Sequence, residues 1–337
     1  MEEYFKDLLN SINNFNSYGN ESVLSDTKEI LSCLEKGMNS NLQLNPELLN
    51  SLVSFVYEID SLISNYGVTF RIDKSGNNIS EYDIHNKQVV IGDKDIAYGR
   101  SDIIIHEIGH AILENELNID YSSESIKDML DNSRTRIMSN NELVQIIMNI
   151  INQIMSMINL QGNTNFNLRE SMIDYSSKNG SYVINGLTNK TKNRLQKKIN
   201  MHKENTFDKL DFSSQQELLK EVISEDLKEN QLLGTCGNLI SVIDMIGAIF
   251  ENDLTLIRLD NSIFESVAHD TDYYSSDYPS LSIKELFAEF LQLSFNPNYK
   301  ENLETLKILL GDEIYSYLKS NFDTVIQIPN IDFNRNI

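Results

Sequence analysis

The sequence predicts an α+β fold that is predominantly helical, with one small sheet. Three observations support this prediction. Apolar residues recur at helical spacing through most of the 337 residues. Two stretches rich in β-branched residues, VTFRID (68–73) and KQVVIGD (87–93), stand on either side of a segment with Gly and Asn, as neighbouring strands do. No period of about 20 to 50 residues repeats, which argues against a solenoid or a propeller.

The composition is that of a globular protein with an acidic surface. The chain is 40% hydrophobic and 23% charged, enough for one large core or two medium ones. A formal net charge of −22 repels phosphate backbones, so nucleic acid is not an expected partner. Cys33 and Cys236 are the only cysteines, which argues against a disulfide framework. The acidic N-terminus predicts a cytoplasmic location and leaves open delivery by a non-classical route or in a phage particle.

Residues 1–64 form a helical N-terminal region. Three helical patterns follow one another there, separated by NSYGNES and NSNLQLNP, which break the periodicity. Residues 65–120 then form the first half of a core. They contain the two strands and a helix from about residue 100 to 117, with Ser101 and Asp102 as candidate cap residues.

Residues 121–260 form a helical insertion rather than a separate domain, because few Pro or Gly residues mark a flexible linker. Helices are expected at 123–136, 139–160, 189–205, 211–229 and 237–250, and loops at 161–165 and 176–186. The most apolar window, 143–160, approaches the length of a bilayer span. Its polar residues fall on one helical stripe, which predicts a core helix and no membrane span.

Residues 261–337 form the second half of the core. A short strand is expected just before it, at 254–259, and a polar loop within it, at 267–274. The apolar spacing then predicts a helix over about residues 280–294 and a closing helical region over 299–320.

The stretch IIIHEIGHAI (103–112) carries the chemistry of the first core helix. His106 and His110 are four residues apart, so a helix projects both imidazoles from one face, where their nitrogens can bind one metal ion. Glu107 stands beside them, placed to accept a proton from a metal-bound water. Gly109 allows another segment to pack closely. The alternative is a buried helix whose histidines are only hydrogen-bonded.

A catalytic zinc usually has three protein ligands and a water, so a third ligand must lie elsewhere in the chain. The continuation H-E-x-x-H-x-x-G-x-x-H is excluded, because Leu113 replaces its glycine and Glu116 replaces its third histidine. Without that glycine the helix continues and carries Glu116 away from the metal. Glu116 is therefore expected at the surface.

The helix at 280–294 offers a better third ligand. Glu285 and Glu289 lie four residues apart in SIKELFAEFL, on one face of a helix whose other residues are mostly apolar. Two carboxylates buried there need partners. A metal ion for Glu285 and an imidazole N–H for Glu289 would supply them. The alternative is that both line a solvated stripe.

With HEIGHAI and a later ELFAEF, the sequence resembles the gluzincin metallopeptidases, in particular the catalytic domain of anthrax lethal factor and the related clostridial Pro-Pro endopeptidases. The resemblance covers residues 85–118 and 268–320, and it implies a zincin-like catalytic core that binds Zn²⁺. The residues whose roles it implies are the zinc ligands His106, His110 and Glu285, the general base Glu107, and the oxyanion donor Tyr278.

The sequence departs from those families in one interval. Here 174 residues separate His110 from Glu285, so a long helical insertion must be accommodated between the two halves of the site. The run HDTDYY (269–274) is also similar to uncharacterised metallopeptidase-like proteins of phages and mobile elements of Firmicutes, in which a His and a Tyr precede the glutamate helix. Candidates that compete with Tyr278 for the oxyanion role are therefore His269, Tyr273 and Tyr274.

The expected function is that of a zinc-dependent endopeptidase acting on a peptide or protein substrate through a zinc-activated water. One alternative is a non-catalytic module that keeps the gluzincin fold and serves a phage particle or a host-interaction complex. Another is a helical adaptor without metal, which requires that Glu285 lie far from His106 and His110. The sequence leaves the oligomeric state and the cleavage preference open.

Overall fold

A computed structural model describes residues 1–14, 21–75, 80–117, 119, 121, 123–157, 173–176, 181–184, 232–251 and 279–326. Contacts divide the chain into two compact units, residues 1–135 with 277–337 and residues 136–276. The described residues are predominantly helical, with a small three-stranded sheet in the first unit, as the α+β prediction requires. The boundaries predicted at residues 64, 120 and 260 stay predictions.

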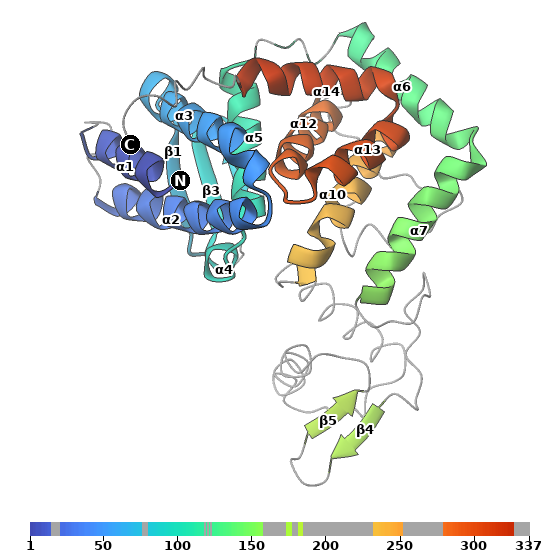
Figure 1. The fold of residues 1–337 in the computed structure, drawn as a ribbon, viewed down its shortest axis with the longest axis horizontal. Coiled ribbons are helices and arrows are strands. Elements are labelled where there is room, and N and C mark those ends of the chain that lie inside the picture. Colours follow the sequence, from blue (N-terminus) through green and yellow to red (C-terminus); the bar gives the residue numbers. More distant parts are fainter. Residues whose placement is uncertain are drawn as a thin grey trace. The chain divides into compact units, whose positions relative to one another are not determined.

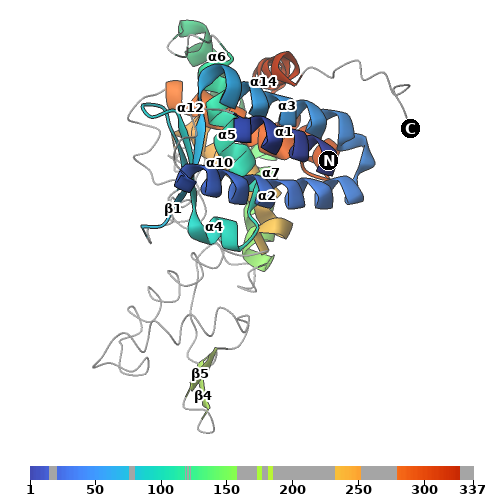
Figure 2. The same ribbon diagram turned by 90° about the vertical axis from the view of Figure 1, so that its left-hand side faces the viewer.

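Helices make up most of the first unit. They are α1 (Glu2–Asn14), α2 (Glu21–Leu44), the 3-10 helix η2 (Pro46–Leu48), α3 (Leu49–Tyr66), α4 (Asp93–Ala97), α5 (Ser101–Asn115), α6 (Glu124–Met138), α12 (Ser280–Ser294), α13 (Tyr299–Leu310) and α14 (Asp312–Val325). The last turn of α6 crosses into the second unit. Within the first unit, α1 lies along α2 and α3, and α5 lies against α12 (Figures 1 and 2).

The sheet of the first unit has three strands in the order β1-β3-β2. The two predicted strands, β1 (Thr69–Asp73) and β3 (Gln88–Gly92), pair in parallel, and β2 (Glu81–Asp83) adds an antiparallel edge. Alternate residues of β1 and β3 are fully covered, because one face of the sheet packs against α2 and α5. Helix α5 therefore packs against this sheet.

The C-terminal end of α3 and the N-terminal end of α5 differ in their capping. Gly67 follows α3 with φ of 70°, a left-handed conformation that glycine adopts without strain, and it turns the chain into β1. The predicted caps of α5 were wrong. Arg100 is the N-cap residue, and no side chain caps the helix. The carboxylate of Asp102 instead accepts hydrogen bonds from the Arg100 guanidinium, at 2.9 Å from Nε and 2.7 Å from Nη2.

Among the described helices, α5 and α12 make the most extensive contact. A Cβ atom on Gly109 would lie 3.1 Å from the Cα of Ala288 and 3.2 Å from Cδ2 of Leu291. Contacts this short are tighter than most Cβ contacts in proteins, so the glycine lets the two backbones approach closely. This confirms the expectation that a second segment packs at Gly109.

The N-terminal helices belong to the same unit as α12. The side-chain amide of Asn41 donates to the carbonyl oxygen of Phe295 at 3.1 Å, and that of Asn45 donates to the carbonyl oxygen of Pro297 at 3.0 Å. Both carbonyls lie just after the end of α12, where helix carbonyls lack intrahelical partners. The end of α2 therefore holds the chain that leaves the second core helix.

The described part of the second unit contains α7 (Asn141–Met157), α10 (Leu232–Phe250) and a hairpin of β4 (Ile173–Ser176) and β5 (Ser181–Ile184). The loop predicted at 176–186 is wrong in part, because β5 lies inside it; Asn179-Gly180 is a hairpin signal that the surrounding helical pattern concealed. The predicted elements at 189–205, 211–229 and 254–259 lie outside the described residues. Among the helices that are described, none has the length and apolarity needed to cross a membrane.

Candidate metal centre

Helix α5 carries the two histidines on one face. Their rings are one helical turn apart, with centroids separated by 4.8 Å, and their Nε2 atoms lie 3.1 Å from each other. His106 is 9% exposed and Glu107 is 7% exposed, while His110 is partly open to solvent. The helix thus presents a pair of imidazole nitrogens at the edge of the core, next to a buried carboxylate.

Helix α12 brings two carboxylates to this pair. Glu285, which is 2% exposed, places Oε2 3.3 Å from Nε2 of His106 and Oε1 3.4 Å from Nε2 of His110. Glu289, which is 6% exposed, places Oε1 3.4 Å from Nδ1 of His106. His106 therefore lies between the two carboxylates, one on each ring nitrogen.

The imidazole nitrogens and both oxygens of Glu285 lie close together. The Nε2 atoms of His106 and His110 are 3.1 Å apart, and each lies 3.3 or 3.4 Å from a different oxygen of Glu285. For comparison, the ligand atoms of a tetrahedral zinc site with metal–ligand bonds of about 2.0–2.1 Å lie about 3.3 Å apart. These three residues, whose ligand atoms all lie within 4.8 Å of one another, could hold a metal ion.

The electrostatics of the cluster favour a positive charge at its centre. Burial lowers the pKa of His106, but the neighbouring carboxylates of Glu289 and Glu285 raise it by more, so that the pKa lies well above its ordinary value. Two imidazole lone pairs and a carboxylate cannot face one another without a cation or protons among them. A metal ion would satisfy all three groups at once.

Glu289 is placed to orient His106. Its Oε1 faces Nδ1 of the imidazole, which fixes Nε2 as the nitrogen that points towards Glu285 and His110. Its second oxygen, Oε2, is covered and has no hydrogen-bond partner among the described residues. Burial lowers the pKa of the Arg100 guanidinium, but the carboxylates of Asp102, Asp95 and Glu289 raise it by more, so this pKa lies above its ordinary value. Glu289 therefore has a positively charged neighbour.

A second ion pair holds α12 in register with α5. Nζ of Lys284 lies 2.5 Å from Oε1 of Glu114 and 4.8 Å from the centroid of the Tyr121 ring. Because Lys284 immediately precedes Glu285, this pair locks the turn of α12 that presents the third ligand. The sequence did not predict this ion pair or the position of Arg100, because Lys284, Glu114 and Arg100 belong to no recognised motif.

Glu116 is the C-cap residue of α5. The prediction that it is a surface residue holds in part, because its exposure is intermediate. Its carboxylate is half-buried and accepts hydrogen bonds from the hydroxyls of Ser61 at 2.8 Å and Tyr66 at 3.1 Å, both on α3. The residue anchors the end of the helix and does not join the metal cluster.

The structure thus brings together His106, His110, Glu285 and Glu289, with Glu107 on the same helix as the histidines. The condition for a helical adaptor without metal, a distant Glu285, is not met. The candidate oxyanion donors Tyr278, His269, Tyr273 and Tyr274 lie outside the described residues.

No protein-family model, no curated protein and no solved structure matches this chain.

Proposed function

We propose that this protein is a zinc-dependent endopeptidase of the gluzincin type, with a zincin-like core that hydrolyses peptide bonds of a protein substrate. The observation that carries the proposal is the convergence of Glu285 on His106 and His110 across 174 intervening residues. A pair of histidines alone has many explanations. A buried glutamate directed at both of them from a different helix has few.

Zinc suits this donor set better than the hard cations Mg²⁺ and Ca²⁺ do. Mg²⁺ and Ca²⁺ prefer oxygen ligands, whereas two imidazole nitrogens and one carboxylate are typical of catalytic zinc. Three protein ligands also leave the fourth position of a tetrahedral site for water or substrate. His110, the ligand that is partly open to solvent, indicates the side from which a substrate would arrive.

The bound zinc would supply Lewis acidity, lowering the pKa of a water to about 7 and polarising a peptide carbonyl. The residues of the chain supply the rest. Glu107 accepts the proton of the attacking water on its carboxylate and then donates it to the leaving amine. Glu289 holds the His106 ring through Nδ1, so that Nε2 keeps its direction during the reaction.

A hydrogen-bond donor for the developing oxyanion completes the proposal. Tyr278 precedes α12 by two residues, and we propose it for this role, with His269 as a second donor. A well-placed donor of this kind contributes about 2 to 4 kcal/mol to transition-state stabilisation. Tyr278→Phe should therefore lower kcat on a cleaved peptide by about 30-fold or more and leave zinc content unchanged.

The decisive test compares zinc content and proteolysis in matched variants. Elemental analysis of the purified chain should find one zinc in both the wild type and Glu107→Gln, because Glu107 is not a ligand. Digestion of a broad peptide library, read by mass spectrometry, should produce cleavage with the wild type only. Glu124→Gln, at an exposed position of α6, is the control for loss of a carboxylate and should cleave normally.

Three outcomes decide among the readings. Zinc in both proteins with cleavage by the wild type alone supports the peptidase. Full zinc occupancy with no cleavage of any library peptide favours a non-catalytic module of gluzincin type. The metal centre itself would be refuted if the wild type bound no zinc. In that case His106→Ala and His110→Ala should also melt at the wild-type temperature, with and without added zinc.

A further inference from the structure

A buried hydroxyl lies one turn before the third candidate ligand of the metal cluster. Ser282 belongs to the first turn of α12 and is 0% exposed. Its Oγ atom has no hydrogen-bond partner among the described residues. A covered hydroxyl without a partner destabilises a folded protein, so such groups usually have one. The first turn of α12 therefore contains a covered hydrogen-bond donor that is not used.

Two other buried helix serines show what is missing at Ser282. Ser54 of α3 and Ser294 at the end of α12 each donate to the carbonyl oxygen four residues earlier, at 3.0 Å and 2.7 Å. A serine inside a helix commonly satisfies its hydroxyl in this way. The residue four positions before Ser282 precedes the helix, which begins at Ser280. The hydroxyl of Ser282 therefore needs an acceptor of another kind.

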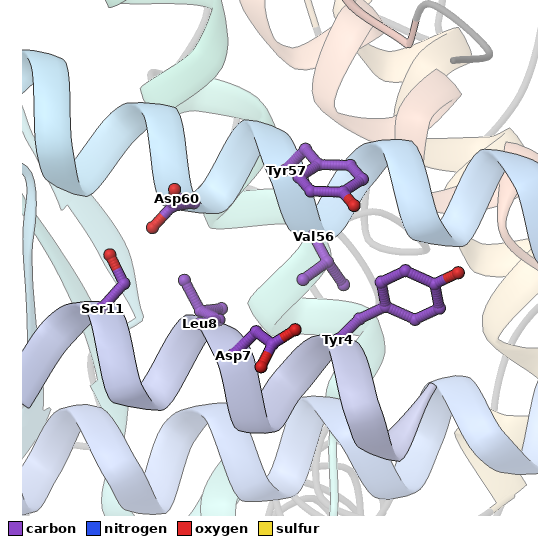
Figure 3. A pocket seen from close by; sticks show the side chains of 7 residues that line it. All are labelled: Tyr4, Asp7, Leu8, Ser11, Val56, Tyr57 and Asp60. Atoms are coloured by element: carbon purple, nitrogen blue, oxygen red, sulfur yellow. The ribbon is translucent and has the colours of Figure 1, made fainter. Parts of the chain in front are cut away.

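Asp60 of α3 shows that a covered atom without a partner does not by itself identify a role. Its Oδ1 atom is also covered and has no hydrogen-bond partner in the described part of the chain. Asp60 lines a small pocket between α1 and α3 whose lining includes no residue of the metal cluster (Figure 3). What distinguishes Ser282 is its position on the helix that carries Glu285.

The helical repeat places Ser282 next to Glu285. Residues three apart are neighbours on the surface of an α-helix, with Cβ atoms about 5–6 Å apart. Helical side chains also lean towards the N-terminus of their helix, so we expect the carboxylate of Glu285 to lean over the turn that contains Ser282. Both residues are buried. A change of rotamer at Ser282 can therefore direct its hydroxyl towards this carboxylate without opening the core.

Metal binding gives Glu285 a use for such a donor. Its Oε2 lies 3.3 Å from Nε2 of His106, and its Oε1 lies 3.4 Å from Nε2 of His110. An imidazole nitrogen that binds a metal ion carries no hydrogen, so neither Nε2 atom can donate to Glu285 while it is a ligand. A ligating carboxylate is normally held by hydrogen bonds of its own. The oxygen of Glu285 that does not bind the metal can accept one from Ser282.

We propose that Ser282 is a positioning residue of the metal centre, whose hydroxyl donates to the non-ligating oxygen of Glu285 when the metal is bound. The inference rests on the metal centre of the proposed function. Ser282 is covered and does not reach a substrate, so it acts only through Glu285. A donor at this oxygen fixes the direction of the carboxylate, and the hydroxyl gains the partner that it otherwise lacks. Both effects increase the affinity for the metal.

The test measures the zinc affinity of the full chain, by competition with a chromogenic chelator, together with its melting temperature after removal of zinc. Ser282→Ala should weaken zinc binding about 10-fold or more, as removal of groups that hold metal ligands does. The zinc-free variant should melt at or above the wild-type temperature, because the substitution removes a covered polar group that has no partner. A hydroxyl with a purely structural role would change the melting temperature alone.

Ser294→Ala is the matched control, since it makes the same change at a buried position of the same helix. The hydroxyl of Ser294 already donates to the carbonyl oxygen of Phe290, so its loss should lower the melting temperature and change zinc affinity less than about twofold. Asp60→Asn is the control for a covered atom without a partner outside the metal cluster, and should keep wild-type zinc affinity. Wild-type affinity in Ser282→Ala, or an equal loss in Ser294→Ala, would overturn the proposal.

These measurements separate the role of Ser282 from the metal centre itself. A wild type that binds no zinc would refute both. A wild type that binds zinc, with equal binding by Ser282→Ala, would refute the role of Ser282 alone. Cobalt(II) in place of zinc adds a spectroscopic signature, because its visible absorption depends on the geometry of the ligands. Ser282→Ala should shift this absorption, and Ser294→Ala should not. None of these measurements depends on peptide cleavage.

Discussion

Two clusters of side chains that include carboxylates lie along α5, one on its buried face and one at its C-terminal end, and their chemistry differs. Along its buried face, Glu285 and Glu289 of α12 meet imidazole nitrogens. At its C-terminal end, Glu116 meets the hydroxyls of Ser61 and Tyr66 on α3, and Glu58 lies close enough that the negative charge of Glu116 affects it. Both places hold two carboxylates near one another.

The difference teaches that the partners, and not the number of acids, decide what such a cluster can do. Hydroxyls donate a hydrogen bond to each oxygen of Glu116, and neither hydroxyl is a usual metal ligand. Burial and then the charge of Glu116 raise the pKa of Glu58 to about 7, so this cluster relieves its repulsion by taking up a proton. Imidazole nitrogens are themselves metal ligands, so the other cluster can relieve the same repulsion by binding a metal ion.

The largest expected effect comes from removing the third ligand. Glu285→Gln should weaken zinc binding more than about 100-fold, since even residues that only orient ligands change metal affinity by about 10- to 100-fold. Competition with a chromogenic chelator measures the affinity. Glu116→Gln is the matched change in the other cluster and should keep wild-type affinity. Similar losses in both variants would mean that the two clusters do not differ as described.

Glu289→Gln tests the orienting role of the second carboxylate. The amide keeps the size of the side chain but accepts a weaker hydrogen bond from Nδ1 of His106, so zinc affinity should fall about 10- to 100-fold. The same chelator competition gives the value. Unchanged affinity, with zinc still bound by the wild type, would show that Glu289 only fills space beside the ring.

Gly109→Val tests whether the close approach of α5 and α12 assembles the metal cluster. Its side chain would collide with Ala288 and Leu291, which should lower the free energy of unfolding by about 1 to 3 kcal/mol and displace Glu285 from the histidines. Urea denaturation and zinc affinity are measured together. Gly67→Ala, at φ of 70°, should cost about 1 to 2 kcal/mol through backbone strain alone and leave zinc affinity unchanged.

The smallest effect concerns Glu58 and depends on pH. Because its pKa is raised from 4.5 to about 7 in the folded chain, the folded state holds this proton more tightly than the unfolded state. Stability is therefore lost as the pH rises from 4.5 through 7. Glu58→Gln should be more stable than the wild type by about 1 kcal/mol at pH 8, after allowance for solvent screening of a half-buried group, and equal to it near pH 4. Urea denaturation across this range measures the difference, which would be independent of pH if Glu58 had an ordinary pKa.

The sequence predicted several of the described helices and the convergence of the cluster residues, for reasons that particular elements show. Helix α12 occupies residues 280–294 as predicted, because a run of apolar residues with two glutamates at helical spacing is a strong local signal. The two histidines needed only the helical repeat to be placed on one face. Glu285 required the chemistry of the donor set, since periodicity cannot join residues so far apart.

The features that escaped prediction are short or depend on contacts. Strand β2 has three residues and α4 has five, too few for a periodic pattern. Asp102 is a residue type that often caps helices, but its carboxylate accepts hydrogen bonds from the guanidinium of Arg100 instead. Glu116 has no apolar signal of its own, and its place is decided by two hydroxyls about 50 residues earlier, at separations of 55 and 50.

The pairing of α5 with α12 also has a consequence in time. A ribosome adds about 5 to 20 residues per second, so roughly 10 to 35 seconds pass between the synthesis of His110 and that of Glu285. During this interval both histidines are present, while the part of α5 at Gly109 that packs against α12 still lacks that partner. The two histidines are synthesised well before Glu285, so the candidate metal centre becomes complete only after α12 has been made.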